Sequence, residues 1–150
     1  MLSLQNMSDR FEIQDLLTRY CTAIDSRNWA ALDDIFTPDA IIDYTEAGGA
    51  RGTLSEIKIY LEKALEQFSN MQHMISAPDL TIDGDTATAR SILFNPMVVE
   101  RDGAPHTFFV GMWYCDDLVR TEQGWRISHR REELSYFHNL PQNFTAVDVS

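Results

Sequence analysis

The segment Phe108-Phe109-Val110-Gly111-Met112-Trp113-Tyr114 carries apolar side chains at both odd and even positions. Neighbouring side chains of an extended strand point to opposite faces, so this segment predicts a strand that is covered on both faces. Helices of the same chain are expected to cover one face. A second copy of the chain is the simplest cover for the other face, and we therefore expect a homodimer or a higher homo-oligomer.

This strand is one of four that the second half of the chain predicts. The four strands are rich in apolar and β-branched residues and span residues 71–82, 86–100, 107–119 and 125–136. Short turns that contain glycine separate the last three strands from one another and from the first. Strands joined by such short turns are expected to form a mostly antiparallel sheet.

The first half of the chain predicts three helices. The first has apolar residues at helical spacing from Ile13 to Ile24, with Ser8 as its N-cap. The second runs from Trp29 to Phe36, and the third opens with the capping box Thr53-Leu54-Ser55-Glu56 and continues to Phe68. Helices followed by hairpin-linked strands predict an α+β domain with its helices on one face of the sheet.

Composition restricts the possible partners. The chain has 150 residues, of which 44% are hydrophobic and 23% charged, so we expect one domain over residues 1–150 with a core of about 9–137. The net charge of −11 argues against nucleic acid and anionic membranes as partners. The chain also shows no apolar run of about 18 residues and no secretion signal. We therefore expect a cytoplasmic protein.

Asp25 is the first candidate for chemistry. It ends the first predicted helix at the edge of the apolar stripe, where the helix dipole disfavours a carboxylate. A carboxylate in this place needs a positive or hydrogen-bond-donating partner. The alternative interpretation is a solvated turn residue.

His73 and Tyr44 are the other two candidates. His73 lies in an apolar strand, where a period of two places it on one face with Met71 and Ile75. An imidazole is suited to general-base catalysis at neutral pH, and an adjacent carboxylate would fix its tautomer. Tyr44 ends a short predicted strand, and as a buried phenol it would donate a hydrogen bond to a substrate carbonyl. The alternatives are a satisfied core histidine and a packing aromatic residue.

Other reactive groups lack the spacing that their chemistry requires. The four histidines form no i, i+4 pair and no His-x-His motif, so no metal site is indicated. Cys21 and Cys115 form no Cys-x-x-Cys motif, and the glycine-rich loop 46–52 lacks a phosphate-binding pattern. We expect neither a metal nor a cofactor, which leaves acid–base chemistry or ligand binding.

Five segments, in the same order along the chain, resemble the SnoaL-like members of the nuclear-transport-factor-two-like superfamily. The resemblance covers about residues 9–131, and the segments that carry it are Leu17–Trp29, Phe36–Tyr44, Gln72–Met74, Ile82–Arg90 and Asp117–Arg130. The resemblance implies a cone-shaped α+β barrel, in which three N-terminal helices and a strongly curved, mostly antiparallel sheet enclose a pocket.

Within this superfamily the chain is most similar in function-bearing residues to scytalone dehydratase. Enzymes of that kind eliminate water from a cyclic hydroxy-ketone without a cofactor. By this resemblance His73 and Asp25 form the general base, and Tyr44 binds the carbonyl group. The implied function is a lyase that acts on a cyclic or aromatic hydroxy-ketone.

The chain departs from the dehydratase at several pocket positions. The tyrosine that precedes the aspartate is Ile24 here, the second pocket histidine is Met97, and a serine and an asparagine are Phe108 and Val110. These apolar replacements, together with Phe94, predict an apolar wall that favours a small apolar or aromatic ligand. The substrate is therefore expected to differ from scytalone.

Several functions stay open at this stage. The alternatives to a dehydratase are a ketosteroid-isomerase-like or SnoaL-like cyclase or isomerase, a non-catalytic ligand-binding module, and a module like the small subunit of a dioxygenase. The distance between the Asp25 and His73 side chains, and whether they face a cavity, discriminates between catalysis and the rest. The tail, residues 138–150, is either a lid over the pocket or a frayed terminus.

Overall fold

The computed structural model describes residues 1–142 and residue 144. Its main feature is one curved sheet, in which the long strands β6 (Thr86–Arg101), β7 (Ala104–Thr121) and β8 (Gly124–His138) form successive antiparallel hairpins. The strand order is β2-β1-β8-β7-β6-β3, and β4 and β5 also pair with β6. Within the described residues, β1 and β8 form the one parallel pair. The structure confirms the predicted α+β class with a mostly antiparallel sheet.

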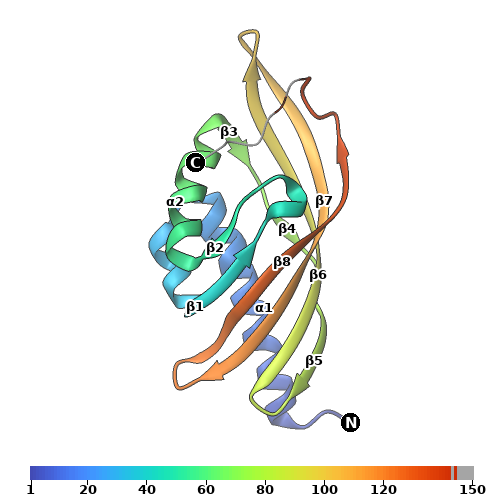
Figure 1. Cartoon of the computed structure of the whole chain (residues 1–150). Coiled ribbons are helices and arrows are strands. Elements are labelled where there is room, and N and C mark those ends of the chain that lie inside the picture. The colour runs from blue at the N-terminus through green and yellow to red at the C-terminus, as the bar shows by residue number, and fades with distance from the viewer. Residues whose placement is uncertain (143, 145–150) are drawn as a thin grey trace.

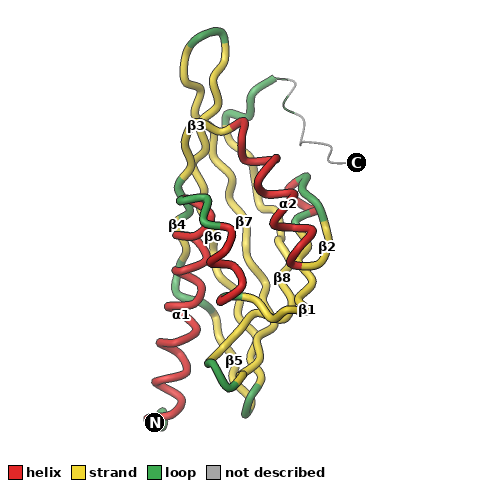
Figure 2. Tube along the Cα trace, turned by 90° about the vertical axis from the view of Figure 1, so that its left-hand side faces the viewer, coloured by secondary structure: helices red, strands yellow, loops and turns green. Residues whose placement is uncertain are grey.

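The helices lie on the concave side of this sheet (Figures 1 and 2). The first half of the chain contains α1 (Leu4–Asp25), η1 (Trp29–Asp34), β1 (Phe36–Asp43), η2 (Thr45–Ala47), β2 (Arg51–Thr53), α2 (Leu54–Ala64) and η3 (Leu65–Gln67). The short strands β3 (Phe68–Met71), β4 (Met74–Ile75) and β5 (Asp79–Asp83) follow. Within the described residues, no helix is both long and apolar enough to cross a membrane.

Strand β7 carries apolar groups on both faces. Phe108 and Val110 are fully buried on the concave side, where α1 and α2 cover the sheet. Phe109 and Trp113 lie on the convex side and are only half-buried. The chain therefore covers one face of this strand, and the other face keeps its apolar side chains partly in contact with solvent.

Two predicted helix boundaries were wrong. Helix α1 begins five residues before Asp9, at Leu4, and its N-cap is Ser3, whose hydroxyl accepts a hydrogen bond from the Asn6 N–H at 3.1 Å. Ser8 is an interior residue of the helix, because no helix-breaking residue separates it from Ser3. The second predicted helix is the 3₁₀ helix η1, and Phe36 already belongs to β1. The capping box at the start of α2 is confirmed.

The predicted strand over residues 71–82 is divided into three short strands. The first division is at Gln72 and His73, which stand between β3 and β4. The backbone N–H of His73 donates a hydrogen bond to the Asp25 carboxylate at 2.9 Å, so it is not available to the neighbouring strand. The grouping of His73 with Met71 and Ile75 still holds for burial, since all three are more enclosed than Gln72.

Candidate active site

A pocket lies between the helices and the concave face of the sheet. Helices α1 and α2 form one side of it, and β6, β7 and β8 form the other. Its lining is mostly apolar and aromatic, with a few polar side chains that come from separate parts of the chain. A concave, largely apolar cavity with a small number of polar groups is the usual form of a small-molecule site.

His73 and Asp25 meet at the edge of this pocket. The Nδ1 atom of His73 lies 2.6 Å from Oδ1 of Asp25, and the His73 side chain is only 7% exposed. His73 lines the pocket, whereas Asp25 stands behind it and is not among the lining residues. Because a carboxylate accepts hydrogen bonds, it fixes the proton on Nδ1 and leaves Nε2 as the basic nitrogen of a neutral imidazole.

The local sequence explains why this contact forms. Helix α1 ends at Asp25, so the carboxylate leaves the last turn of the helix and reaches the loop between β3 and β4. One carboxylate oxygen binds the His73 ring and the other binds the His73 backbone N–H. This double contact holds both the position and the ring orientation of His73. It also supplies the donor that an acid at a helix C-terminus needs.

Asn95 is a polar pocket residue that the sequence analysis missed. It is 5% exposed, and its side-chain amide lies 3.3 Å from Nε2 of His73. With the amide nitrogen toward the ring, Asn95 donates to a neutral imidazole. With the amide oxygen toward the ring, it accepts from a protonated Nε2, and its nitrogen donates to the Gln72 and Pro96 carbonyls. The amide therefore suits both protonation states of a general base.

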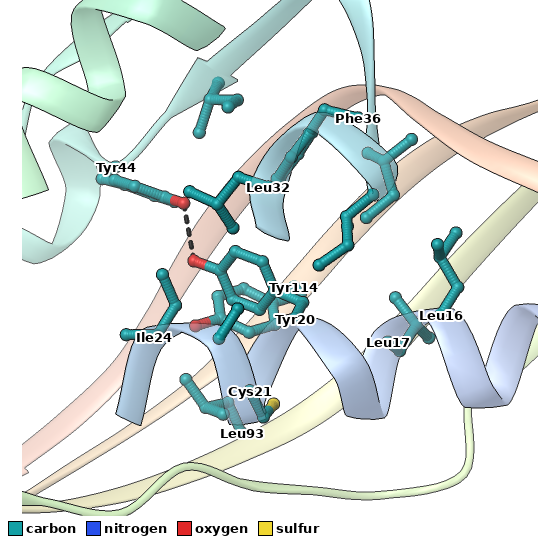
Figure 3. Close-up of a cluster of buried hydrophobic side chains, with 14 of the residues drawn as sticks. Leu16, Leu17, Tyr20, Cys21, Ile24, Leu32, Phe36, Tyr44, Leu93 and Tyr114 are labelled. Atoms are coloured by element: carbon teal, nitrogen blue, oxygen red, sulfur yellow. Dashed lines mark hydrogen bonds between the residues drawn. The ribbon is translucent and has the colours of Figure 1, made fainter. Parts of the chain in front are cut away.

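Tyr44 also faces the pocket, where it pairs with Tyr20. Their hydroxyl oxygens are 2.6 Å apart and both side chains are buried (Figure 3). Burial raises the pKa of Tyr20 to about 12 and holds the pKa of Tyr44 well above its usual value. Both phenols are thus neutral near pH 7. One hydroxyl proton is used between them, which leaves the other for a ligand.

Tyr20 was predicted only as part of the apolar stripe of the first helix. A buried tyrosine usually finds a partner for its hydroxyl, and that rule is the signal that could have singled it out. It lies one helical turn before Ile24, the position where the dehydratase has its second tyrosine. Helix α1 therefore also supplies a phenol to the pocket, although from a different position, and Tyr60 and Tyr114 line the pocket as well.

Four residues were predicted to form an apolar wall of the pocket. Met97, Phe108 and Val110 line the pocket, but Phe94 does not. Side chains alternate along β6, and Asn95 takes the inward position, so Phe94 points to the convex side. There its ring packs against Phe109, with a centroid distance of 5.3 Å.

The tail contributes one described residue to the wall. The ring of Phe144 lines the pocket and packs on Phe108 and Phe68, with centroid distances of 5.4 Å and 6.1 Å. Residues 143 and 145–150, which belong to the expected lid, lie outside the described residues. A lid over the pocket therefore stays a prediction.

A buried ion pair packs against two of the tyrosine rings, and a buried acid lies close to it on β8. The Arg130 guanidinium donates to both oxygens of Asp116, at 2.7 Å and 2.8 Å, and lies 4.0 Å from the ring centroids of Tyr20 and Tyr114. Glu132, two residues further along β8, lines the pocket itself. The sequence analysis placed both Arg130 and Glu132 in the predicted strand 125–136 and did not single them out.

Comparison with known proteins identifies a family and several solved structures of similar fold. A family model described as a SnoaL-like domain matches residues 5–131. The uncharacterized protein Rv2910c of Mycobacterium tuberculosis is 48% identical over 140 residues, which are 93% of this chain and 94% of that protein.

Two solved structures have names that denote elimination reactions. A Novosphingobium aromaticivorans protein, provisionally named a scytalone dehydratase, has a TM-score of 0.79 and 16% identity, covering 96% of this chain and 95% of its own. The hexachlorocyclohexane dehydrochlorinase LinA-type3 of Novosphingobium barchaimii has a TM-score of 0.77 and 17% identity, covering 97% and 98%. At such low identity these similarities establish the fold alone.

Proposed function

The chain belongs to the SnoaL-like family, and from this premise we propose that it is a cofactor-independent lyase that removes water from a cyclic or aromatic hydroxy-ketone. The observation that carries the proposal is the 2.6 Å contact between His73 and Asp25 on a histidine that lines the pocket. A positioned imidazole–carboxylate pair next to an apolar cavity is suited to removing a proton from carbon. A plain binding module has no need for such a pair.

The reaction begins at the carbon next to the ketone. Nε2 of His73 takes a proton from this carbon, and the electrons of the C–H bond form a C=C bond while the carbonyl becomes an enolate. Asp25 stabilises the imidazolium that results. Tyr44, through the hydroxyl pair with Tyr20, donates a hydrogen bond to the enolate oxygen, where negative charge develops.

Water leaves in the second step. The enolate carbonyl re-forms, the C–O bond to the β-hydroxyl breaks, and the protonated Nε2 of His73 returns its proton to the departing hydroxyl. The products are an unsaturated ketone and water, and His73 is neutral again. If the proton returns instead to another carbon, the same groups catalyse an isomerisation, so the isomerase or cyclase alternative shares the first step.

The test is a panel of cyclic β-hydroxy-ketones fused to an aromatic ring, together with the same ketones without the hydroxyl group. We expect the protein to accelerate exchange of the α-proton for deuterium in D2O by at least about 10²-fold over buffer, because a positioned base has that effect. NMR measures the exchange, and ultraviolet absorbance measures the unsaturated product. Ligands that raise the melting temperature without any exchange would instead support the binding-module alternative.

We also propose that the convex face of the sheet binds a second copy of the chain. This face carries a convex patch of five apolar residues, of which Ile92 is 57% and Tyr136 49% exposed, and the others are Phe94, Phe109 and Trp113. Exposed apolar patches of this kind mark association sites. In such a dimer the second chain would cover the convex face of β7, which the first chain leaves partly exposed.

Light scattering at micromolar concentration should give the mass of two chains for the wild-type protein. Replacement of Ile92 by lysine places a charge within the convex patch and should give a monomer. The matched control is Ile59→Lys, since Ile59 is 63% exposed on α2, on the other side of the molecule. A monomeric wild-type protein would contradict the proposal.

A further inference from the structure

Glu132 is a buried acid that the mechanism above does not use. It lies on β8 opposite Tyr114, it is only 7% exposed, and it lines the same pocket as His73 and Tyr44. Within the described residues, no group forms a hydrogen bond or an ion pair with its carboxylate. A carboxyl group that is buried without a partner lowers the stability of the fold, so its presence in a cavity indicates a use.

The charged groups near Glu132 do not neutralise it. Arg130 attracts the charge of Glu132 and so lowers its pKa, but two of its guanidinium nitrogens are bound to Asp116, and no hydrogen bond or ion pair joins it to Glu132 among the described residues. The carboxylates of Asp43 and Glu46, on β1 and η2, disfavour the negative charge of Glu132. Burial acts in the same direction and is the larger effect, so the pKa of Glu132 rises to about 8.

The other titratable groups around Glu132 are phenols that stay neutral. They come from α1, the junction of β1 with η2, α2 and β7, and they are Tyr20, Tyr44, Tyr60 and Tyr114. The charge of Glu132 acts on all four, which places it in the same part of the pocket as the Tyr20–Tyr44 hydroxyl pair. At pH 7 this part of the pocket therefore offers hydrogen-bond donors, and no lysine or arginine is among its described lining residues.

We propose that Glu132 is a ligand-binding group, whose neutral carboxyl donates a hydrogen bond to an oxygen atom of a bound carbonyl compound. The inference rests on the proposed function in that it takes the ligand to be a ketone. It adds a second donor beside the tyrosine pair, and it narrows the ligand to molecules that place an oxygen acceptor at β8. A carboxylate in the same place would repel the lone pairs of that oxygen.

The matched probes are 2-tetralone and tetralin, which share a ring skeleton and differ in the ketone oxygen. At pH 6 Glu132 should contribute about 3–10-fold to the preference of the wild-type protein for 2-tetralone over tetralin, the range expected for one neutral hydrogen bond. At pH 9 the preference should fall by this factor, because Glu132 is then ionised, and the contribution of the tyrosine pair remains. Calorimetry measures both affinities, and tetralin binding should not change between the two pH values.

Two variants separate a hydrogen bond from a packing effect. Glu132→Gln keeps a donor that cannot ionise, so the ketone preference should persist at both pH values. Glu132→Leu removes this donor and leaves the tyrosine pair, so the preference should be reduced equally at both pH values. A preference that is independent of pH in the wild-type protein, or one that Glu132→Leu does not reduce, would overturn the inference.

Unfolding in urea gives a readout that needs no ligand. The folded protein keeps the Glu132 proton up to about pH 8, whereas the unfolded chain loses it near its ordinary pKa. The free energy of unfolding of the wild-type protein should therefore fall, relative to Glu132→Gln, as the pH rises from 5 to 8. An identical pH dependence of the two proteins would show that Glu132 ionises normally and would overturn the inference.

The outcomes also separate this inference from the proposed function. If His73→Ala leaves α-proton exchange unchanged while the ketone preference still depends on Glu132, the base is wrong and the binding role of Glu132 stands. If α-proton exchange depends on His73 but the preference for 2-tetralone over tetralin does not depend on Glu132, the lyase proposal stands and this inference fails.

Discussion

Replacing His73 with alanine is expected to lower turnover of a confirmed substrate by about 10²–10⁴-fold, the range that a positioned general base contributes. Asp25→Asn should lose at least as much, because the amide no longer stabilises the imidazolium and no longer fixes the proton on Nδ1. Steady-state kinetics measures both effects. The loss should be in kcat, since neither change removes apolar contact with the ligand.

The chain supplies a matched control for this experiment. His129 and Asp117 also form a histidine–carboxylate pair, 3.7 Å apart, but their side chains are 39% and 63% exposed and neither lines the pocket. His129→Ala should leave turnover unchanged. If His73→Ala and Asp25→Asn both keep full turnover in a folded protein, the base is wrongly assigned.

The largest effect on stability is expected at the buried ion pair. Asp116→Ala leaves the Arg130 guanidinium charged and without its partner, and both side chains are fully buried in the wild-type protein. Removing one member of such a pair should lower the free energy of unfolding by about 3–5 kcal/mol. Urea denaturation monitored by fluorescence measures this change.

Two comparisons make the stability experiment specific. The double variant Asp116→Leu with Arg130→Met removes both charges and should recover most of the lost stability, because apolar residues of similar size can replace a buried pair. Asp15→Ala breaks the exposed pair of Asp15 with Arg19 and should change stability by less than about 1 kcal/mol. If Asp116→Ala is no more harmful than Asp15→Ala, the buried pair does not support the fold.

Local patterns were sufficient for much of the fold. The capping box at Thr53 and the apolar, β-branched segments separated by glycine turns over residues 86–136 are properties of neighbouring residues, so they can be read from the chain directly. The division of the strand at His73 was not predictable in this way, because its cause is the carboxylate of Asp25, 48 residues earlier. Helix α1 was underestimated because most residues of its first turns are polar and its buried apolar residues begin only at Ile13.

The same distinction, between local patterns and contacts of distant residues, applies to the residues of the candidate site. Asp25 and His73 were predicted because an unpaired acid at a helix end and a histidine among apolar residues are both unusual. Asn95 and Glu132 were missed, since a polar residue at one strand position shows its direction only when the register of the sheet is known. The same reason explains the wrong placement of Phe94, the neighbour of Asn95.

The base and the wall of the pocket come from different parts of the chain. Asp25 and His73 precede the long strands, whereas Met97, Phe108 and Val110 belong to β6 and β7 and make no hydrogen bond to the base. Substitutions in the wall can therefore change the shape that the cavity accepts while the proton-transfer apparatus stays intact. During evolution, substitutions of this kind can change which substrate is accepted while the type of reaction stays the same. A library of variants at these three positions would therefore select new substrates for the same reaction.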